Sequence, residues 1–213
     1  MISAEYLYCD ERGRPRLRKL RHEPDKRFSM QAARYRNDRL YWKADPGCIE
    51  RWQSDWAPRA MYNLTVLLDA LKYGEPTFLV EGERDADTLV ALKKLPATTN
   101  WQGASTFTVE QAEWFTRSKG SVINIVRDAD PAGAYAAWTR YTALIVSGVG
   151  KRRIRLWVPP PGIKDVTDLL RAGLSGSALV REVPAAVEAL ASTEEAIRAA
   201  RGYLSHPTDE VAS

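Results

Sequence analysis

The sequence predicts an α/β fold, in which a four-stranded parallel sheet is covered by helices on both faces and is preceded by a small basic α+β region. From residue 77 onward, short apolar runs alternate with segments of helical periodicity, which is the order of βαβ units. The runs have few polar interruptions, as strands buried on both faces do. With 213 residues, 45% of them hydrophobic and 27% charged, the chain can form one sizeable core with a small appended domain.

Residues 1–74 form the predicted N-terminal region. Strand-like alternation runs from Ala4 to Trp42, with turns at 11–13 and 24–25, and predicts a small antiparallel sheet. Four leucines then repeat at helical spacing and predict a helix over 61–73, namely Leu64, Leu67, Leu68 and Leu71. The Gly-Glu-Pro at 74–76 marks the boundary to the next region.

Residues 75–175 form the predicted α/β domain. The expected strands are 77–80, 97–99, 122–126 and 154–158, and the expected helices are 85–94, 109–117, 134–146 and 166–171. Residues 176–213 are rich in Ala and Glu and are interrupted by Pro184. We expect two closing helices there, followed by a loose tail from Ser205.

Three acidic clusters each follow a predicted strand of this domain. Their sequences are EGERD at 81–85, DAD at 128–130 and KDVTD at 164–168. The ligand crevice of an open α/β sheet lies beyond the carboxyl ends of its strands, and Mg²⁺ prefers oxygen ligands, so the clusters predict a divalent-cation site. Taken singly, Asp128, Asp130 or Asp165 can equally cap the next helix. The occurrence of three clusters in this order favours a site.

The motifs around these acids resemble the Toprim domain, which bacterial-type DNA primases, type IA and II topoisomerases and several nucleases share. The shared pattern is a strand, Glu-Gly-x-x-Asp, a helix, a second strand and Asp-x-Asp-x-x-Gly. The segments VEGERDADTLVAL at 80–92 and ATTNWQGAS at 97–105 are most similar to primases of phages and mobile elements. The resemblance covers about residues 76–173 and implies a Rossmann-like Toprim fold.

The resemblance also implies roles for individual acids and a Mg²⁺ or Mn²⁺ cofactor. Glu81 matches the family's glutamate, a general acid/base or metal ligand, and Asp85 matches the acid that closes the first motif. The remaining acids, which match metal-binding positions, are Asp128, Asp130, Asp165 and Asp168. The match of the last two is shorter than that of the first pair.

Cations and a small-residue loop beside the acids predict contacts with a nucleotide. Lys164 and Arg84 adjoin motif residues, where a positive charge can neutralise a transferred phosphoryl group, although each can equally pair with a neighbouring carboxylate. We assign Lys164 to catalysis with Glu81 and Asp85, and Arg84 to nucleotide binding. The loop at 100–105 adds Asn100 and Gly103, because small loops at helix starts admit phosphates.

The positive charge of the N-terminal region is concentrated in one stretch. The net charge is +4 and the pI about 9.1, but residues 12–43 hold twelve Lys and Arg against three Asp and Glu. Arginines track phosphates and interleaved aromatic rings stack on bases, so we expect single-strand binding; a solvated sheet face is the alternative. The expected contacts are Arg14, Arg16, Arg18, Lys19, Arg34, Arg36, Tyr41 and Trp42.

Other features exclude several classes of protein. Cys9 and Cys48 are the only cysteines and His22 and His206 the only histidines, so neither a disulfide framework nor a zinc or histidine-based catalytic site is expected. No P-loop motif is present. The sequence has no signal-peptide pattern and no apolar stretch near the roughly 20 residues that span a bilayer, so we expect a cytoplasmic protein.

These observations lead to three hypotheses on function. The first is a primase-like nucleotidyltransferase that makes short primers on single-stranded DNA from nucleoside triphosphates. The second is a Toprim-type nuclease, in which water replaces the hydroxyl nucleophile, and the third is a non-catalytic single-strand-binding accessory protein. The zinc-binding module that usually precedes a primase core has no counterpart here, so a separate zinc-binding module or a replicative helicase is an expected partner.

Overall fold

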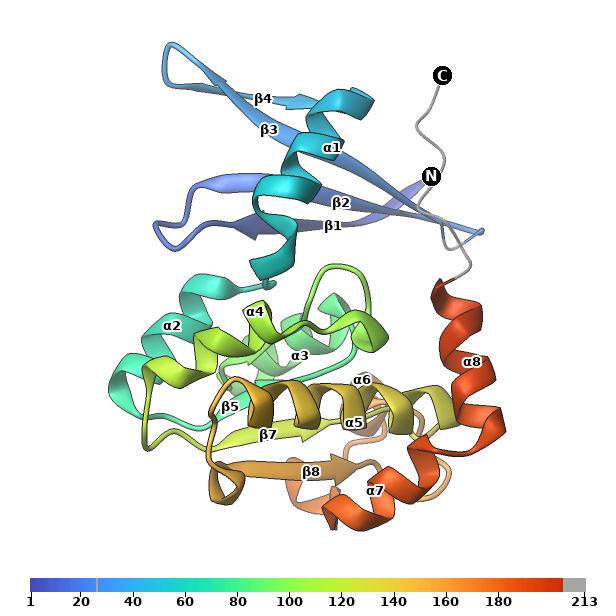
Figure 1. Ribbon diagram of the computed structural model, residues 1–213. Coiled ribbons are helices and arrows are strands. Elements are labelled where there is room, and N and C mark those ends of the chain that lie inside the picture. The colour runs from blue at the N-terminus through green and yellow to red at the C-terminus, as the bar shows by residue number, and fades with distance from the viewer. Residues whose placement is uncertain (26, 205–213) are drawn as a thin grey trace.

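The computed structural model describes residues 1–25 and 27–204, so the tail expected from Ser205 lies outside the described residues. Two sheets, each with its own helices, are stacked one above the other (Figure 1). Within the described ranges, no helix has both the length and the apolar character that crossing a bilayer requires.

The first sheet consists of four antiparallel strands in the order β1-β2-β3-β4, which confirms the small antiparallel sheet expected from the sequence. Its strands are β1 (Ile2–Cys9), β2 (Pro15–His22), β3 (Phe28–Arg36) and β4 (Arg39–Lys43). Helix α1 (Pro46–Asp55) and the turn η1 (Ala57–Arg59) cover one face. Tyr8, Leu17 and Ala32 are buried on that face, because alternate residues of a strand point the same way.

The second sheet has five strands in the order β6-β5-β7-β8-β9. They are β5 (Thr77–Leu79), β6 (Ala97–Thr98), β7 (Ile123–Val126), β8 (Ile154–Val158) and β9 (Val180–Glu182). The first four are parallel, and β9 pairs antiparallel with β8. The expected four-stranded parallel sheet is therefore a mixed five-stranded one. The edge strand β9 was missed because its three residues are largely exposed and form no apolar run.

Helices cover both faces of the second sheet, as expected. One face packs on α2 (Leu64–Tyr73), α4 (Val109–Ala112), η3 (Glu113–Arg117) and α5 (Pro131–Val146), and α7 (Pro184–Ala191) and α8 (Glu194–Leu204) pack in turn on α5. The other face carries α3 (Glu83–Lys93), α6 (Val166–Arg171) and η5 (Gly176–Ala178). Two further short helical turns are η2 (Ala104–Thr106) and η4 (Lys151–Arg153). Leu79, Ile123 and Ile125 are fully buried under α2 and α5.

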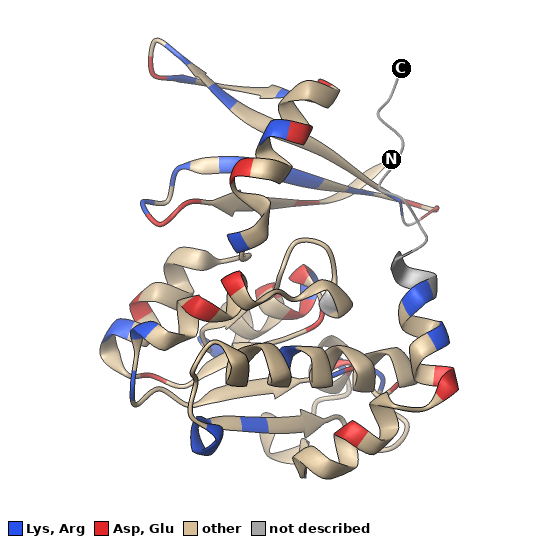
Figure 2. Ribbon diagram, viewed as in Figure 1, with Lys and Arg blue, Asp and Glu red and all other residues tan. Residues whose placement is uncertain are grey.

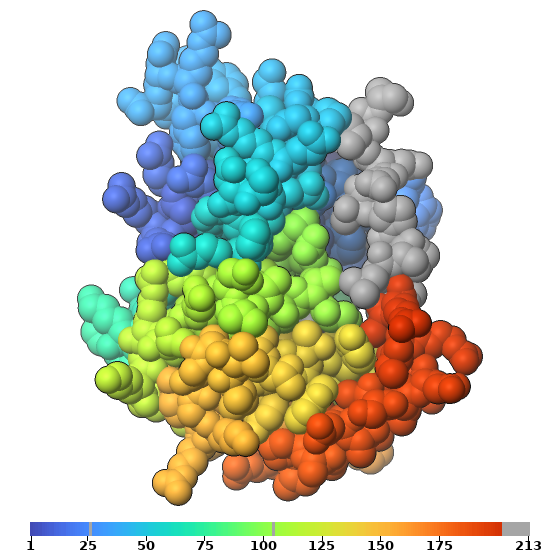
Figure 3. All heavy atoms as spheres, viewed as in Figure 1, coloured from blue at the N-terminus to red at the C-terminus, as the bar shows by residue number. Residues whose placement is uncertain are grey.

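A buried ion pair joins the two sheets. Lys19 of β2 donates from Nζ to Glu83 Oε1 at 2.8 Å and to the carbonyl of Trp101 at 3.1 Å. Tyr8 of β1 donates its hydroxyl to the same carboxylate oxygen at 2.7 Å, and burial raises the pKa of Tyr8 well above its ordinary value, so it remains a donor. Figure 3 shows the N-terminal unit resting broadly on the segments below it. The first sheet is thus held against the first turn of α3.

Removing either charge of this pair is expected to destabilise the protein. The Lys19 and Glu83 side chains are only 12% and 9% exposed, so Lys19→Met or Glu83→Gln leaves a buried charge without its partner, at a cost of about 3 kcal/mol. The double variant should recover part of that loss, because neither charge then remains. Urea unfolding of the four proteins measures the coupling energy, and strictly additive losses would show that the pair contributes nothing.

Candidate functional site

A cleft of about 460 Å³ lies between the two sheets, at the carboxyl ends of β5, β6 and β7. Both units line it. Tyr6, Arg21 and Phe28 come from the first sheet, and the second unit contributes Glu81, Gly82, Glu83, Arg84, Asp85, Gln102, Gly103, Ser105, Thr106, Asp128, Ala132, Lys164 and Asp165. The cleft therefore brings residues of all three acidic clusters together, as strand topology predicts.

Glu81 and Asp128 are joined directly. Glu81 follows β5, and its Oε1 accepts a hydrogen bond of 2.9 Å from the backbone N–H of Asp128, which follows β7. Gly133, in the first turn of α5, allows this approach. A Cβ at that position would meet the Asp128 carbonyl and would lie 2.7 Å from Glu81 Oε1. The glycine of the Asp-x-Asp-x-x-Gly motif is thus required by close packing against the glutamate.

The environment of the cleft disfavours the ionised form of its carboxylates. Burial first, and then the negative charges of Glu81, Asp85, Asp130 and Asp165, raise the pKa of Asp128 to about 9. Burial also raises the pKa of Glu81 and of Asp85. Several acids that repel one another in a partly buried site favour either protonation or the arrival of positive charge. We refer to Glu81, Asp85 and Asp128 as the carboxylate cluster, because their charges affect one another's pKa.

Arg140 of α5 supplies a positive charge from beneath the cluster. It is fully buried, and its Nη2 donates to Thr99 Oγ1 at 3.1 Å and to Asn100 Oδ1 at 3.0 Å. Its charge lowers the pKa of Glu81, while burial lowers the pKa of Arg140 itself to about 10, so the guanidinium remains charged at neutral pH. Sequence reasoning missed this residue; the available signal was a lone arginine within the apolar helix, seven residues after Gly133.

Some of the predicted acids also perform the capping role that the sequence left open. Asp130 Oδ1 accepts from the N–H of Gly133 at 2.8 Å and caps α5, and Asp165 Oδ1 accepts from the N–H of Asp168 at 2.7 Å and caps α6. Asp85 accepts from the N–H of Thr167 at 3.1 Å and so ties α3 to α6. Capping holds these carboxylates in place and leaves their other oxygen lone pairs for further contacts.

The remaining predicted residues differ in how close they lie to the cluster. Arg84 and Lys164 line the cleft, and Arg84 pairs with Asp165 at 2.9 Å. Asn100 is buried and organises the 100–106 loop by donating to the Gly103 carbonyl and to Thr106 Oγ1. Asp168 does not line the cleft; it pairs with Arg171 on the surface of α6 at 3.5 Å.

The oxygen ligands that line the cleft suit a hard divalent cation, but their side chains are not already arranged around a common point. Among the described residues, no three Asp, Glu, His or Cys side chains stand together as a ready metal cage. The cleft offers carboxylate oxygens and no cysteine or histidine, which suits Mg²⁺ or Mn²⁺.

Fold and cleft together define a class: the chain has the fold of a bacterial primase catalytic core. No protein-family model matches the sequence, and no curated protein does. Among solved structures, the E. coli primase catalytic core is 19% identical with a TM-score of 0.55, covering 82% of this chain and 49% of that one. A DnaG catalytic core is 17% identical with a TM-score of 0.60, and the match covers 96% of this chain and 63% of that one. The Aquifex aeolicus primase, with its zinc-binding and RNA polymerase domains, is 18% identical with a TM-score of 0.54. That match covers 96% of this chain and 47% of that one.

The chain thus spans less than two thirds of the length of each of these structures. At such identities the likeness establishes the fold alone.

Neutralising Asp128 is expected to stabilise the metal-free protein. The folded-state pKa of about 9 lies above the ordinary 3.8, so the folded protein binds this proton more tightly than the unfolded chain does. The corresponding stability is present below pH 4 and is lost as the pH rises toward 9. Asp128→Asn does not titrate, and at pH 7 it should raise the free energy of unfolding by at least about 1.4 kcal/mol, the equivalent of one pKa unit.

Urea unfolding in the presence of a chelator, at several pH values between 4 and 9, measures this difference. Asp168→Asn is the matched control, because it removes a partly exposed carboxylate that lies outside the cleft, and its effect should stay below about 1 kcal/mol. An advantage of Asp128→Asn that does not grow with pH would contradict the electrostatic account.

Proposed function

We propose that the chain is a Toprim-type, primase-like nucleotidyltransferase that joins nucleoside triphosphates into short primers on single-stranded DNA. The observation that carries this proposal is the contact between Glu81 and the start of the Asp-x-Asp segment, at the carboxyl edge of a sheet with the fold of a primase core. The basic first sheet forms the opposite wall of the same cleft. The N-terminal unit therefore contributes Tyr6, Arg21 and Phe28 directly to the wall of the cleft.

In this proposal Glu81, Asp128 and Asp130 hold Mg²⁺ or Mn²⁺ with Asp165, whereas Asp168, which lies outside the cleft, is assigned no ligand role. A bound divalent cation would orient the triphosphate and lower the pKa of the attacking 3′-hydroxyl. Arg140 keeps a fixed positive charge behind Glu81, which favours the ionised carboxylate.

The cations and the loop at the rim have the nucleotide-binding role. Arg84 and Lys164 line the cleft, where their charges can neutralise a transferred phosphoryl group. Gly103 lines the other side at a backbone φ of 91°, a left-handed conformation that favours glycine, and Asn100 fixes the loop from below. Asp85 positions the first motif by anchoring α3 to α6.

We assign the template strand to the outer face of the first sheet. There the Arg14 guanidinium lies 4.8 Å from the Tyr35 ring centre, and Arg18 lies 4.8 Å from that of Trp42. Arg16 and Arg18 alternate with buried residues on β2, so they share this face, and Figure 2 shows Lys and Arg spread along the sheet. One similar structure is a DnaG primase catalytic domain bound to single-stranded DNA, at 18% identity and a TM-score of 0.56.

The other expected strand contacts occupy different positions. Lys19 is engaged with Glu83 between the sheets, and Arg34 donates from Nε and Nη2 to Cys48 Sγ at 3.3 and 3.0 Å on the face that α1 covers. Arg36 and Tyr41 are exposed near the β3–β4 turn. We keep these residues as secondary contacts at the edge of the sheet.

The proposal also includes the location of the protein and its partners. We propose a cytoplasmic replication protein of phage or mobile-element type. A separate zinc-binding module would then supply template-sequence recognition, and a replicative helicase would supply the single strand.

Primer synthesis on single-stranded DNA tests the proposal directly. With Mg²⁺ or Mn²⁺ and nucleoside triphosphates, the wild type should make dinucleotides and longer primers. Glu81→Gln and Asp128→Asn should each lower the rate by at least about 100-fold, because each removes a carboxylate that would hold the cation at the reacting phosphate. Asp168→Asn, outside the cleft, is the control and should retain most of the activity.

Two outcomes would contradict the assignment. Metal-dependent degradation of unprimed DNA or RNA without added nucleotides, lost in the same variants, would identify a nuclease. Metal-independent strand binding that Glu81→Gln leaves unchanged, with no turnover in either metal, would identify a non-catalytic accessory protein.

The outer face of the first sheet has its own test. Trp42→Ala should weaken binding of a single-stranded oligonucleotide by about 1–3 kcal/mol, because it removes a stacking surface. Arg18→Ala should weaken binding and reduce the salt slope by about 0.7 per phosphate contact. Arg152→Ala, on η4 at the opposite ends of the strands, is the control. Fluorescence anisotropy across a salt series measures both effects, and equal affinities in all variants would exclude this face.

A further inference from the structure

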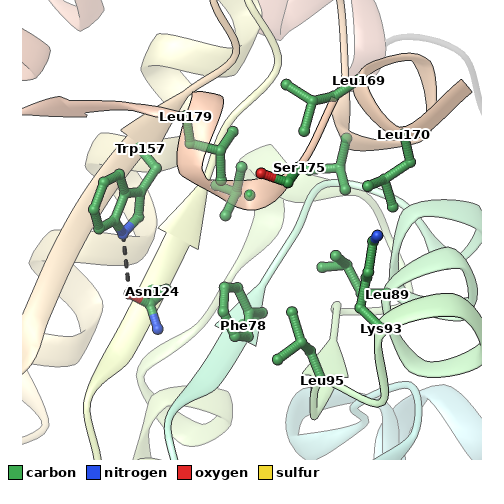
Figure 4. Close-up of a pocket in the computed structure, with 13 residues that line it drawn as sticks. Phe78, Leu89, Lys93, Leu95, Asn124, Trp157, Leu169, Leu170, Ser175 and Leu179 are labelled. Carbon is green, nitrogen blue, oxygen red and sulfur yellow. Dashed lines mark hydrogen bonds between the residues drawn. The ribbon is translucent and has the colours of Figure 1, made fainter. Parts of the chain in front are cut away.

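A second cavity, of about 250 Å³, lies on the face of the second sheet opposite α5 (Figure 4). Its floor is formed by outward-facing residues of the strands, Phe78, Asn124, Val126 and Trp157. Its walls come from α3, α6 and the segment at 175–179. Leu89, Val126, Val166 and Leu169 are buried around it. None of these residues lines the carboxylate cleft between the sheets.

The lining of this cavity is almost entirely apolar. The one amide in its floor is satisfied, because Asn124 Nδ2 donates to the Thr77 carbonyl at 3.2 Å and its Oδ1 accepts from Trp157 Nε1 at 3.0 Å. Each polar atom of that amide thus already has one protein partner, and the rest of the floor is apolar. An engineered apolar cavity of about 150 Å³ stays dry and binds benzene, so this larger cavity has room for a ring system bigger than benzene.

Among the residues that the structure describes, Lys93 is the one cation that lines this cavity. Lys93, in the last turn of α3, is exposed there. Figure 4 shows its side chain running along the cavity with the ammonium nitrogen toward Leu170. Lys93 forms no ion pair with any residue that the structure describes. The charge is thus available to an occupant.

We propose that this cavity binds a small apolar molecule that carries one carboxylate. The ring or short chain fills the space between Phe78, Leu89 and Leu169, and the acid pairs with Lys93 at the mouth. Shape, apolar lining and one external cation match this class of ligand, whereas a nucleotide would leave its base unpaired and its phosphates in contact with leucines.

The cavity and the carboxylate cleft are connected through helices α3 and α6. Leu89 belongs to α3, and Val166 and Leu169 belong to α6. These two helices are joined at their first turns by the hydrogen bond from Thr167 N–H to the Asp85 carboxylate. A ligand that packs against both helices therefore stabilises the pair that positions Asp85. The inference concerns binding alone and does not depend on the proposed primase activity.

Binding of a naphthalene carboxylate and of its neutral carboxamide tests the proposal. Both should give saturable shifts of the Trp157 indole N–H and of leucine methyl signals in NMR spectra, and the carboxylate should bind about threefold more tightly, as an exposed ion pair allows. Lys93→Met should erase this preference. Leu179→Trp should fill the cavity and abolish binding of both probes, and Leu95→Trp provides a second filling variant if the first fails to fold.

Three outcomes would overturn the proposal. Equal affinities for the acid and the amide in the wild type would exclude the anionic class. Saturable binding that persists in a folded cavity-filling variant would place the probes elsewhere. The absence of saturable shifts at Trp157 would exclude the cavity. The experiment uses neither metal nor nucleotides, so a failure of primer synthesis leaves its result unaffected.

Discussion

The hydrogen bond from the Asp128 backbone to Glu81 is the contact on which the site depends. It joins the ends of two neighbouring parallel strands, and it exists only because the first turn of α5 presents a glycine at the point of closest approach. Burial at this point raises the pKa of both Asp128 and Glu81, and the neighbouring negative charges raise that of Asp128 further. The fold tolerates this repulsion because Arg140 lies fully buried beneath it and because protonation or a bound cation can relieve the rest.

The second constraint is the ion pair between the sheets. Lys19 and Tyr8 both bind one oxygen of Glu83, two residues after Glu81 in the chain, so the first sheet is fixed relative to the acidic loop. Residues 1–74 are for this reason more than an appended binding region, because Tyr6, Arg21 and Phe28 form part of the cleft wall. The Lys19–Glu83 pair therefore connects the cleft wall contributed by the first sheet to the acidic loop.

Much of this arrangement follows from sequence pattern, and the remainder depends on long-range pairing. The apolar runs and the acids after them predicted the parallel strands and the clustering of Glu81, Asp85, Asp128 and Asp165, since parallel strands end at a common edge. The prediction of a four-stranded sheet missed one strand, because β9 is too short and too exposed to show a pattern of alternating apolar residues. Arg140 and the Lys19–Glu83 pair were missed because burial of a charge depends on a partner that local periodicity does not reveal. The roles of the acids in metal binding stay predictions.

Capping and ligand binding, which the sequence presented as alternatives, are compatible at these residues. Asp130 and Asp165 each use one oxygen to cap a helix, and Arg84 pairs with the second oxygen of Asp165. The cations that line the cleft are therefore partly neutralised by its own acids. In the proposed function Arg84 would pair with a phosphate oxygen of the triphosphate, and Asp165 would be among the carboxylates that hold the cation. Such an exchange conserves the number of charge pairs, so binding requires little net desolvation of unpaired charge.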